Sequence, residues 1–262
     1  MNQLMPTTFD APLVALSFAI SLIGAFVALT ASSRILGRGL RVSVFNALAA
    51  GFALGGVGVW AMHFVGMLAL KVNMGVSYSL AETGVSLVAA VGGSTLALLW
   101  VARKPDSLPR VLGAGVLLGL GVCVMHYLGM YGMRFAGYIR WSLDAVALSM
   151  AIAVAAATAA LWLAFRARSL TARGFASVFM AAAVCAMHYT GMAAADFICT
   201  SPNPQTIPSG TGLMTSFDLP SVVSVVALGA ALIIFVDQML QHVEAHVRRP
   251  VPVRIDPRSR AR

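Results

Sequence analysis

Three histidines recur within the same short phrase along this sequence of 262 residues. The phrase reads Met-His-aromatic-X-Gly-Met and occupies residues 62–67, 125–130 and 187–192. Its histidines are His63, His126 and His188, which are 63 and then 62 residues apart. Such regular spacing marks an internal repeat, so the chemistry of the chain is sought in these three places.

The residue types in the phrase suit a soft metal ion. In a helix, each His shares a face with the Met four residues later and the Gly three residues later. Imidazole nitrogen and thioether sulfur suit copper, particularly the reduced ion, better than magnesium or calcium. Zinc held by three histidines and haem held by two are alternatives, although no Cys-x-x-Cys-His attachment motif is present. The candidate metal ligands are His63, His126, His188, Met67, Met130, Met192, Met62, Met125 and Met187.

Four further side chains are secondary candidates. Cys123 and Cys185 stand three residues before their histidines, on the same helical face, and Tyr127 and Tyr189 follow directly after them. The first copy has Trp60 and Phe64 at these places. One such His–Met pair alone is more often core packing, whereas three copies with one spacing favour a ligand site.

The three phrases lie in a sequence that is typical of a membrane protein. The chain is 59% hydrophobic and 10% charged, with a mean hydropathy of +0.86. A helix needs roughly 20 apolar residues to span a bilayer, and strands of a membrane barrel would alternate in polarity. The sequence therefore predicts an all-α fold with seven transmembrane helices, at residues 11–33, 42–70, 83–102, 111–133, 145–165, 174–195 and 219–236.

Arginine and lysine set the predicted orientation. Fifteen of the 18 lie in one alternate set of connections and in the C-terminal tail. The positive-inside rule then places the N-terminus outside and the C-terminus in the cytoplasm of a bacterial inner membrane. The net charge of +9 is explained by this asymmetry and anionic lipid rather than by nucleic-acid binding.

Basic loops of equal length begin each copy, so the repeat unit is a helical hairpin and the fold is three hairpins plus one helix. All three histidines then lie in the outer leaflet. Lys71, Arg134 and Asp196 follow their histidines by eight residues, which puts the rings about 12 Å inside the boundary. The membrane domain is expected to fill residues 1–240, followed by a short, disordered basic tail at 241–262.

The three phrases resemble the MHYT domain, a bacterial seven-helix membrane sensory module, and Met187-His188-Tyr189-Thr190 is its motif verbatim. The resemblance implies a copper site near the outer face that senses oxygen, carbon monoxide or nitric oxide. Many relatives carry cyclic-di-guanylate, kinase or DNA-binding domains after this module. Because the chain ends soon after the seventh span, output is expected to pass through a separate cytoplasmic signalling protein.

The predicted function is a membrane sensor that binds a metal, with copper preferred, and responds to a diatomic gas or to redox state. The alternative is a copper-handling or transport protein, but the inner halves of the motif helices are mainly Ala, Gly, Leu and Val, which argues against a continuous polar path. An enzyme is not expected, because no acid–base set accompanies the histidines.

Overall fold

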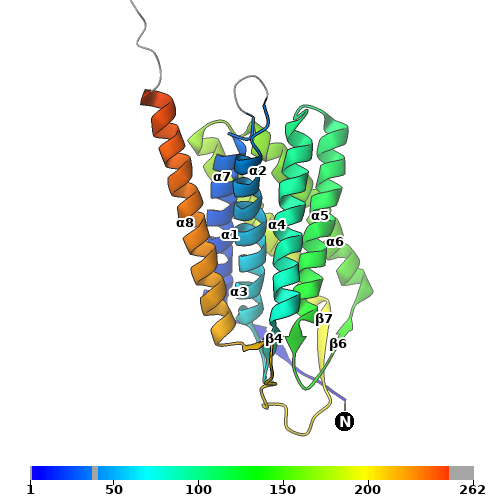
Figure 1. The fold of residues 1–262 in the computed structure, drawn as a ribbon. Coiled ribbons are helices and arrows are strands. Elements are labelled where there is room, and N and C mark those ends of the chain that lie inside the picture. Colours follow the sequence, from blue (N-terminus) through cyan, green and yellow to red (C-terminus); the bar gives the residue numbers. More distant parts are fainter. Residues whose placement is uncertain (1, 37–40, 248–262) are drawn as a thin grey trace, which may run out of the picture.

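The computed structural model describes residues 2–36 and 41–247. Within them, seven helices are long and apolar enough to cross a membrane (Figure 1), which confirms the all-α seven-helix prediction. The helix bounds are α1 Ala11–Ser32, α2 Val44–Gly51, η1 Phe52–Ala61, α3 Met62–Ala69, α4 Leu80–Ala102, α5 Leu108–Tyr131, α6 Leu143–Arg166, α7 Leu170–Ala193 and α8 Asp218–Val247.

Helix α8 continues to Val247, past the boundary predicted at residue 240. The first part of the expected tail is therefore helical. The remainder of that tail, residues 248–262, lies outside the described residues.

The second span is one continuous helix, Val44–Ala69, built from α2, η1 and α3. Its middle part, η1, is a π-helix that ends just before His63. A π-helix places more residues in each turn than an α-helix. From the last loop arginine to the histidine there are 22 residues in the first copy and 16 and 15 in the others. This difference arises mainly because Arg41 precedes its helix, whereas Arg110 and Arg173 lie inside α5 and α7.

Within residues 2–36 and 41–247, eight short strands cap one end of the bundle, and the all-helical prediction did not include them. We call this the strand end, and the opposite end, which carries Arg34, Arg103 and Arg166, the arginine end. The strands form three small antiparallel sheets, in the orders β1-β7-β6, β2-β3 and β5-β4-β8. Their bounds are β1 Gln3–Leu4, β2 Thr7–Phe9, β3 Leu70–Val72, β4 Ser77–Ser79, β5 Met133–Arg134, β6 Gly137–Trp141, β7 Ala195–Cys199 and β8 Leu213–Thr215.

Six of the seven spans form a closed ring. Contacts run from α1 to η1, α4, α5, α6 and α7, and from α7 back to α1. Helix α8 follows α7 in the chain, yet it packs on α1, η1 and α3 at the outside of the ring (Figure 1). Helix α1 thus occupies the place beside α7 that the returning helices α4 and α6 occupy in the other two hairpins.

Short polar side chains stand directly before the first residue of most helices. A Ser or Asp at this position accepts a hydrogen bond from a free backbone N–H of the first turn. Asp10 accepts from Leu13 N at 3.2 Å, and Ser169 accepts from Ala172 N at 3.1 Å. Serine also directly precedes four other helices, at Ser43, Ser79, Ser107 and Ser142.

Gly24 allows α1 to approach the second span closely, and we predict that Gly24→Ala destabilises the bundle. A Cβ there would collide with the backbone of Gly58 and reach 2.8 Å from the carbonyl oxygen of Ala53. Overpacking of this kind costs about 1–3 kcal/mol. The control is Gly92→Ala, because a Cβ at Gly92 meets nothing within 4 Å. Thermal unfolding in detergent measures both, and an equal melting temperature for the two variants would contradict the prediction.

Candidate metal centre

The three motif histidines meet at one buried point. His63 lies on α3, His126 on α5 and His188 on α7, and their exposed fractions are 0%, 0% and 1%. The Nδ1 atom of His63 lies 3.1 Å from that of His188 and 3.1 Å from that of His126. The third Nδ1–Nδ1 distance is 3.3 Å. Three nitrogens from three helices therefore form a nearly equilateral triangle.

These three contacts cannot all be hydrogen bonds. A ring nitrogen either carries a proton and donates, or carries a lone pair and accepts. With two states among three mutually adjacent atoms, at least one pair must be donor facing donor or acceptor facing acceptor. A cation at the centre of the triangle removes the conflict, because all three nitrogens then accept.

The size of the triangle fits such a cation. The point equidistant from the three Nδ1 atoms in their plane lies about 1.8 Å from each, which follows from edges of 3.1, 3.1 and 3.3 Å. Nitrogen–metal bonds to histidine are about 2.0 Å long. Among the described residues, His63, His126 and His188 form a group that could hold a metal ion.

The Nε2 side of each histidine ring packs against the glycine of another copy. A Cβ on Gly129 would collide with Nε2 of His63, one on Gly191 with His126, and one on Gly66 with His188. The three contacts pass around the axis in one direction. Glycine in the phrase therefore makes room for a neighbouring imidazole, and the three Nε2 atoms have no hydrogen-bond partner in the part of the chain that the structure describes.

The six motif methionines are buried, with exposed fractions of 0–2%. The methionines that stand four positions after each histidine lie one helical turn closer to the strand end. There, Met67 and Met130 line hollows in the surface. On the other side of the histidines, Met187 lines an internal cavity. The methionines thus enclose the histidine layer, and their role as ligands stays a prediction.

We call α1, α4 and α6, which alternate with the histidine helices in the ring, the outer helices. The hydroxyls of Tyr127 and Tyr189 point toward two of them. Tyr127 Oη lies 2.5 Å from Oγ of Ser149 on α6, and Tyr189 Oη lies 2.8 Å from Oγ of Ser17 on α1. Because both serines donate to a carbonyl of their own helix, each tyrosine is the donor. These hydrogen bonds fix the rings beside the histidines rather than directing the oxygens at the centre.

The first copy makes the same bond with a different residue. Trp60 Nε1 donates to Ser86 Oγ on α4 at 3.1 Å, while Phe64 packs edge-on against Trp60 with ring centroids 5.0 Å apart. The indole N–H of Trp60 therefore takes the role of the tyrosine hydroxyl, which Phe64 lacks. Sequence reasoning missed the serines, although Ser86 and Ser149 each follow the histidine of their copy by 23 residues.

Neither Cys123 nor Cys185 belongs to the cluster that the histidines form. Cys123 is buried, Cys185 is partly buried, and both are free thiols. The structure does not place them at the centre.

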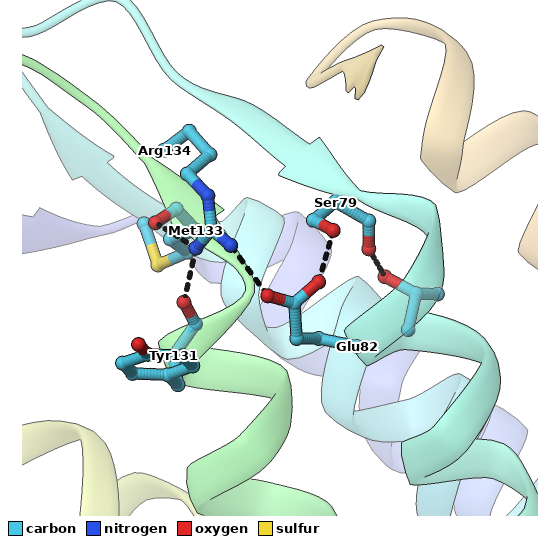
Figure 2. Close-up of polar contacts among 6 residues, drawn as sticks. Ser79, Glu82, Tyr131, Met133 and Arg134 are labelled. Carbon is cyan, nitrogen blue, oxygen red and sulfur yellow. Dashed lines mark hydrogen bonds and ion pairs between the residues drawn. The ribbon is translucent and has the colours of Figure 1, made fainter. Parts of the chain in front are cut away.

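Ion pairs surround the strand end. The residue eight positions after each histidine pairs with a charge from another segment, and Figure 2 shows one pair, in which Glu82 also accepts from Ser79. Exposed pairs contribute little stability, so their effect is to fix how the segments lie over the site. The pairs are Lys71 with Asp10, Arg134 with Glu82, and Asp196 with Arg140.

The fold and the site together define a multi-pass membrane protein with a buried histidine centre. The chain belongs to the MHYT family: the family model described as "Bacterial signalling protein N terminal repeat" matches residues 56–114, 119–177 and 182–246. Each match contains one histidine of the triangle. The resemblance predicted from the sequence is confirmed, and with it a membrane signalling role.

The curated relatives include three named signalling proteins. The bifunctional diguanylate cyclase/cyclic di-GMP phosphodiesterase MucR of Pseudomonas aeruginosa is 37% identical over 73% of this chain and 28% of its own length. The cyclic di-GMP phosphodiesterase NbdA of the same organism is 36% identical over 79% and 26%. The signaling protein YkoW of Bacillus subtilis is 30% identical over 72% and 24%. This chain thus spans about a quarter of each, and no solved structure matches it.

We predict that the Trp60–Ser86 bond can be exchanged for the tyrosine version. Trp60→Cys removes a large buried ring and should cost about 3 kcal/mol. Phe64→Tyr alone adds a hydroxyl next to a serine that already accepts from Trp60. The double variant reproduces the second and third copies, so it should be more stable than the sum of the single effects predicts. A double-mutant cycle from chemical unfolding measures this, and strict additivity would contradict it.

Proposed function

We propose that this chain is a membrane sensor in which His63, His126 and His188 hold one copper ion and present it to a diatomic gas. The observation that carries the proposal is the triangle of buried Nδ1 atoms, 3.1–3.3 Å apart. Burying three neutral imidazoles against one another in an apolar bundle, without a full set of hydrogen bonds, costs free energy unless a cation lies among them.

The surroundings favour a monovalent ion. The cost of moving an ion into a low-dielectric interior rises with the square of its charge, and the candidate cluster contains no carboxylate among the described residues. Copper(I) therefore suits the site better than zinc. Haem is disfavoured, because imidazole centroids 4.8–5.2 Å apart leave no slot for a macrocycle between two rings.

A bound copper(I) ion would supply a soft Lewis acid with affinity for carbon monoxide, nitric oxide or oxygen. The protein's own residues hold and shield it. The imidazoles fix its position, the motif methionines exclude water on both sides, and Tyr127 and Tyr189 lock the ring orientations through their serine partners.

An apolar cavity of about 30 Å³ next to the histidine layer supports the gas part of the proposal. Val59, Val122 and Val184 line it, and each stands one turn before a motif histidine on the same face. Small apolar cavities stay dry and accept apolar guests. A diatomic gas dissolved in the bilayer would find a preformed space there.

The same cavity weakens the transport alternative. A cation that left the histidines toward the arginine end would enter a cavity lined by valines, leucines and alanines, where the thioethers of Met180 and Met187 are the ligands available in the lining, and no charged or hydroxyl side chain of the lining continues the path. We therefore prefer a sensor over a copper transporter.

The topology and the output complete the proposal. We place the strand end outside and the arginine end in the cytoplasm of the bacterial inner membrane, with residues 1–240 as the sensory domain and 241–262 as a tail. MucR and NbdA are named as cyclic di-GMP enzymes. In this proposal such activity belongs to signalling partners or linked domains, and the membrane module has no catalytic role.

Removing the three imidazoles should abolish nitrogen-bound copper. After anaerobic loading with copper(I), we expect about one nitrogen-bound copper per chain in the unchanged protein and no nitrogen-bound copper in His63→Ala/His126→Ala/His188→Ala, measured by elemental analysis and X-ray absorption. Ser94→Ala is the control, because it removes a buried polar atom on α4. Circular dichroism checks folding, and the single His→Ala variants provide weaker sites if the triple variant unfolds. Equal nitrogen-bound copper in all variants would contradict the site.

Filling the cavity should slow gas binding without removing copper. Ala157 lines the cavity from α6 with 6% of its surface exposed. We expect Ala157→Leu to slow carbon monoxide rebinding after flash photolysis roughly fivefold or more, since the guest loses its space. Ala151→Leu, at an exposed position on the same helix, is the matched control. Unchanged rebinding in the Ala157 variant would exclude this cavity as the gas site.

A further inference from the structure

Two hollows open at the strand end, and methionines lie in both. The first, of about 510 Å³, is lined in part by Met67, Met74 and Met133. The second, of about 370 Å³, is lined in part by Met130 and Met133. Met133 therefore borders both hollows. Met74 and Met133 belong to no copy of the repeated phrase.

Each hollow leads toward a histidine. Met67 stands four residues after His63 and Met130 four residues after His126, so each thioether lies about 6 Å along the helix from its imidazole. The exposed fractions fall from 7% at Met74 and Met133 to 2% at Met67 and 0% at Met130. The methionines thus extend from the surface to the layer above the buried centre.

The lining chemistry selects a soft cation. Neither hollow is lined by an Asp, Glu, His or Cys side chain, so a hard divalent ion finds no carboxylate there. Thioethers bind copper(I) in preference to magnesium, calcium or manganese. The two basic side chains in the linings are Lys71 and Arg134, and each is paired with a carboxylate, which reduces their repulsion of a cation.

Figure 2 shows how the segment that carries Met133 is held. Arg134 donates to the carbonyl oxygen of Tyr131 at 2.6 Å and pairs with Glu82 on α4. The backbone of β5 is thereby tied to the first turn of another helix. Met133 is presented from a fixed strand and not from a free loop.

We propose that Met67, Met74 and Met133 form an acquisition site for copper(I) at the strand end, from which Met67 and Met130 pass the ion to the histidines. The inference rests on the proposed copper function. The transfer is a ligand exchange: copper–sulfur bonds break, copper–nitrogen bonds form, and no electron or proton is required, because thioethers and the accepting nitrogens are neutral. The valine-lined cavity on the other side also has two lining methionines, Met180 and Met187, but at about 30 Å³ it is far smaller than the two hollows.

The first test measures the rate of loading. Met74→Leu/Met133→Leu keeps side-chain volume close to the original while removing two sulfurs. Under anaerobic transfer from a coloured copper(I)–chelator complex, we expect this variant to load roughly tenfold more slowly, yet to reach the same one copper per chain, because the slow step loses its ligands. The control is Met150→Leu/Met239→Leu, at two exposed methionines on α6 and α8. Equal loading rates in all three proteins would overturn the proposal.

The second test isolates the acquisition site. In the variant that lacks the three histidines, X-ray absorption should show copper(I) bound by sulfur alone, and that signal should disappear when Met74→Leu/Met133→Leu is added. The absence of a sulfur-only signal overturns the acquisition site, while nitrogen-bound copper in the unchanged protein still upholds the proposed function. The opposite result, sulfur-bound copper with no nitrogen-bound copper in the unchanged protein, upholds the acquisition site and overturns the histidine centre.

Discussion

The structure depends on one constraint: three imidazole nitrogens converge in an apolar interior where they cannot satisfy one another by hydrogen bonds. Neighbouring elements are arranged around that point. The phrase glycines admit the rings at their Nε2 side, the outer helices supply serines that hold the adjacent aromatic residues, and ion pairs hold the strands over the top. The shared geometry follows from repetition, because three copies running in the same direction through the bundle bring their histidines to one depth.

Much of this arrangement could be predicted from the sequence, because apolar length and repeat spacing are local properties of the chain. The convergence of His63, His126 and His188 follows from spacing and from an even number of spans per copy. The strands could not be foreseen. β1 pairs with β7 and thus joins Gln3 to Cys199, a pairing that depends on how the helices have already been assembled.

Chain order also misleads at the third copy. The sequence repeat continues into α8, and the family model includes it, but in space α1 stands beside α7 and Ser17 takes the role of Ser86 and Ser149. A six-helix ring needs a sixth helix between the first and third histidine helices, and α1 fills that place. The sequence showed Trp60 and Phe64 only as departures from the other two copies. That Trp60 compensates for the hydroxyl missing at Phe64 became clear only from the position of Ser86.

Helix α8 lies outside the ring because α1 occupies the place beside α7, and there α8 packs against α1, η1 and α3. Gln238 on α8 is fully buried and donates to Asn46 Oδ1 at 3.0 Å, and Asn46 lies in the first turn of the continuous helix Val44–Ala69 that also carries His63. Between them lies the π-helical segment η1, whose wide turns pack against α1, α4 and α8. A change in how the imidazoles are held would act on α3 first, and the next element along the helix is the one whose winding departs from the α-helix. Helix α8 is therefore connected to the histidine centre in two ways, by direct packing on α3 and by the buried hydrogen bond to the helix that carries His63.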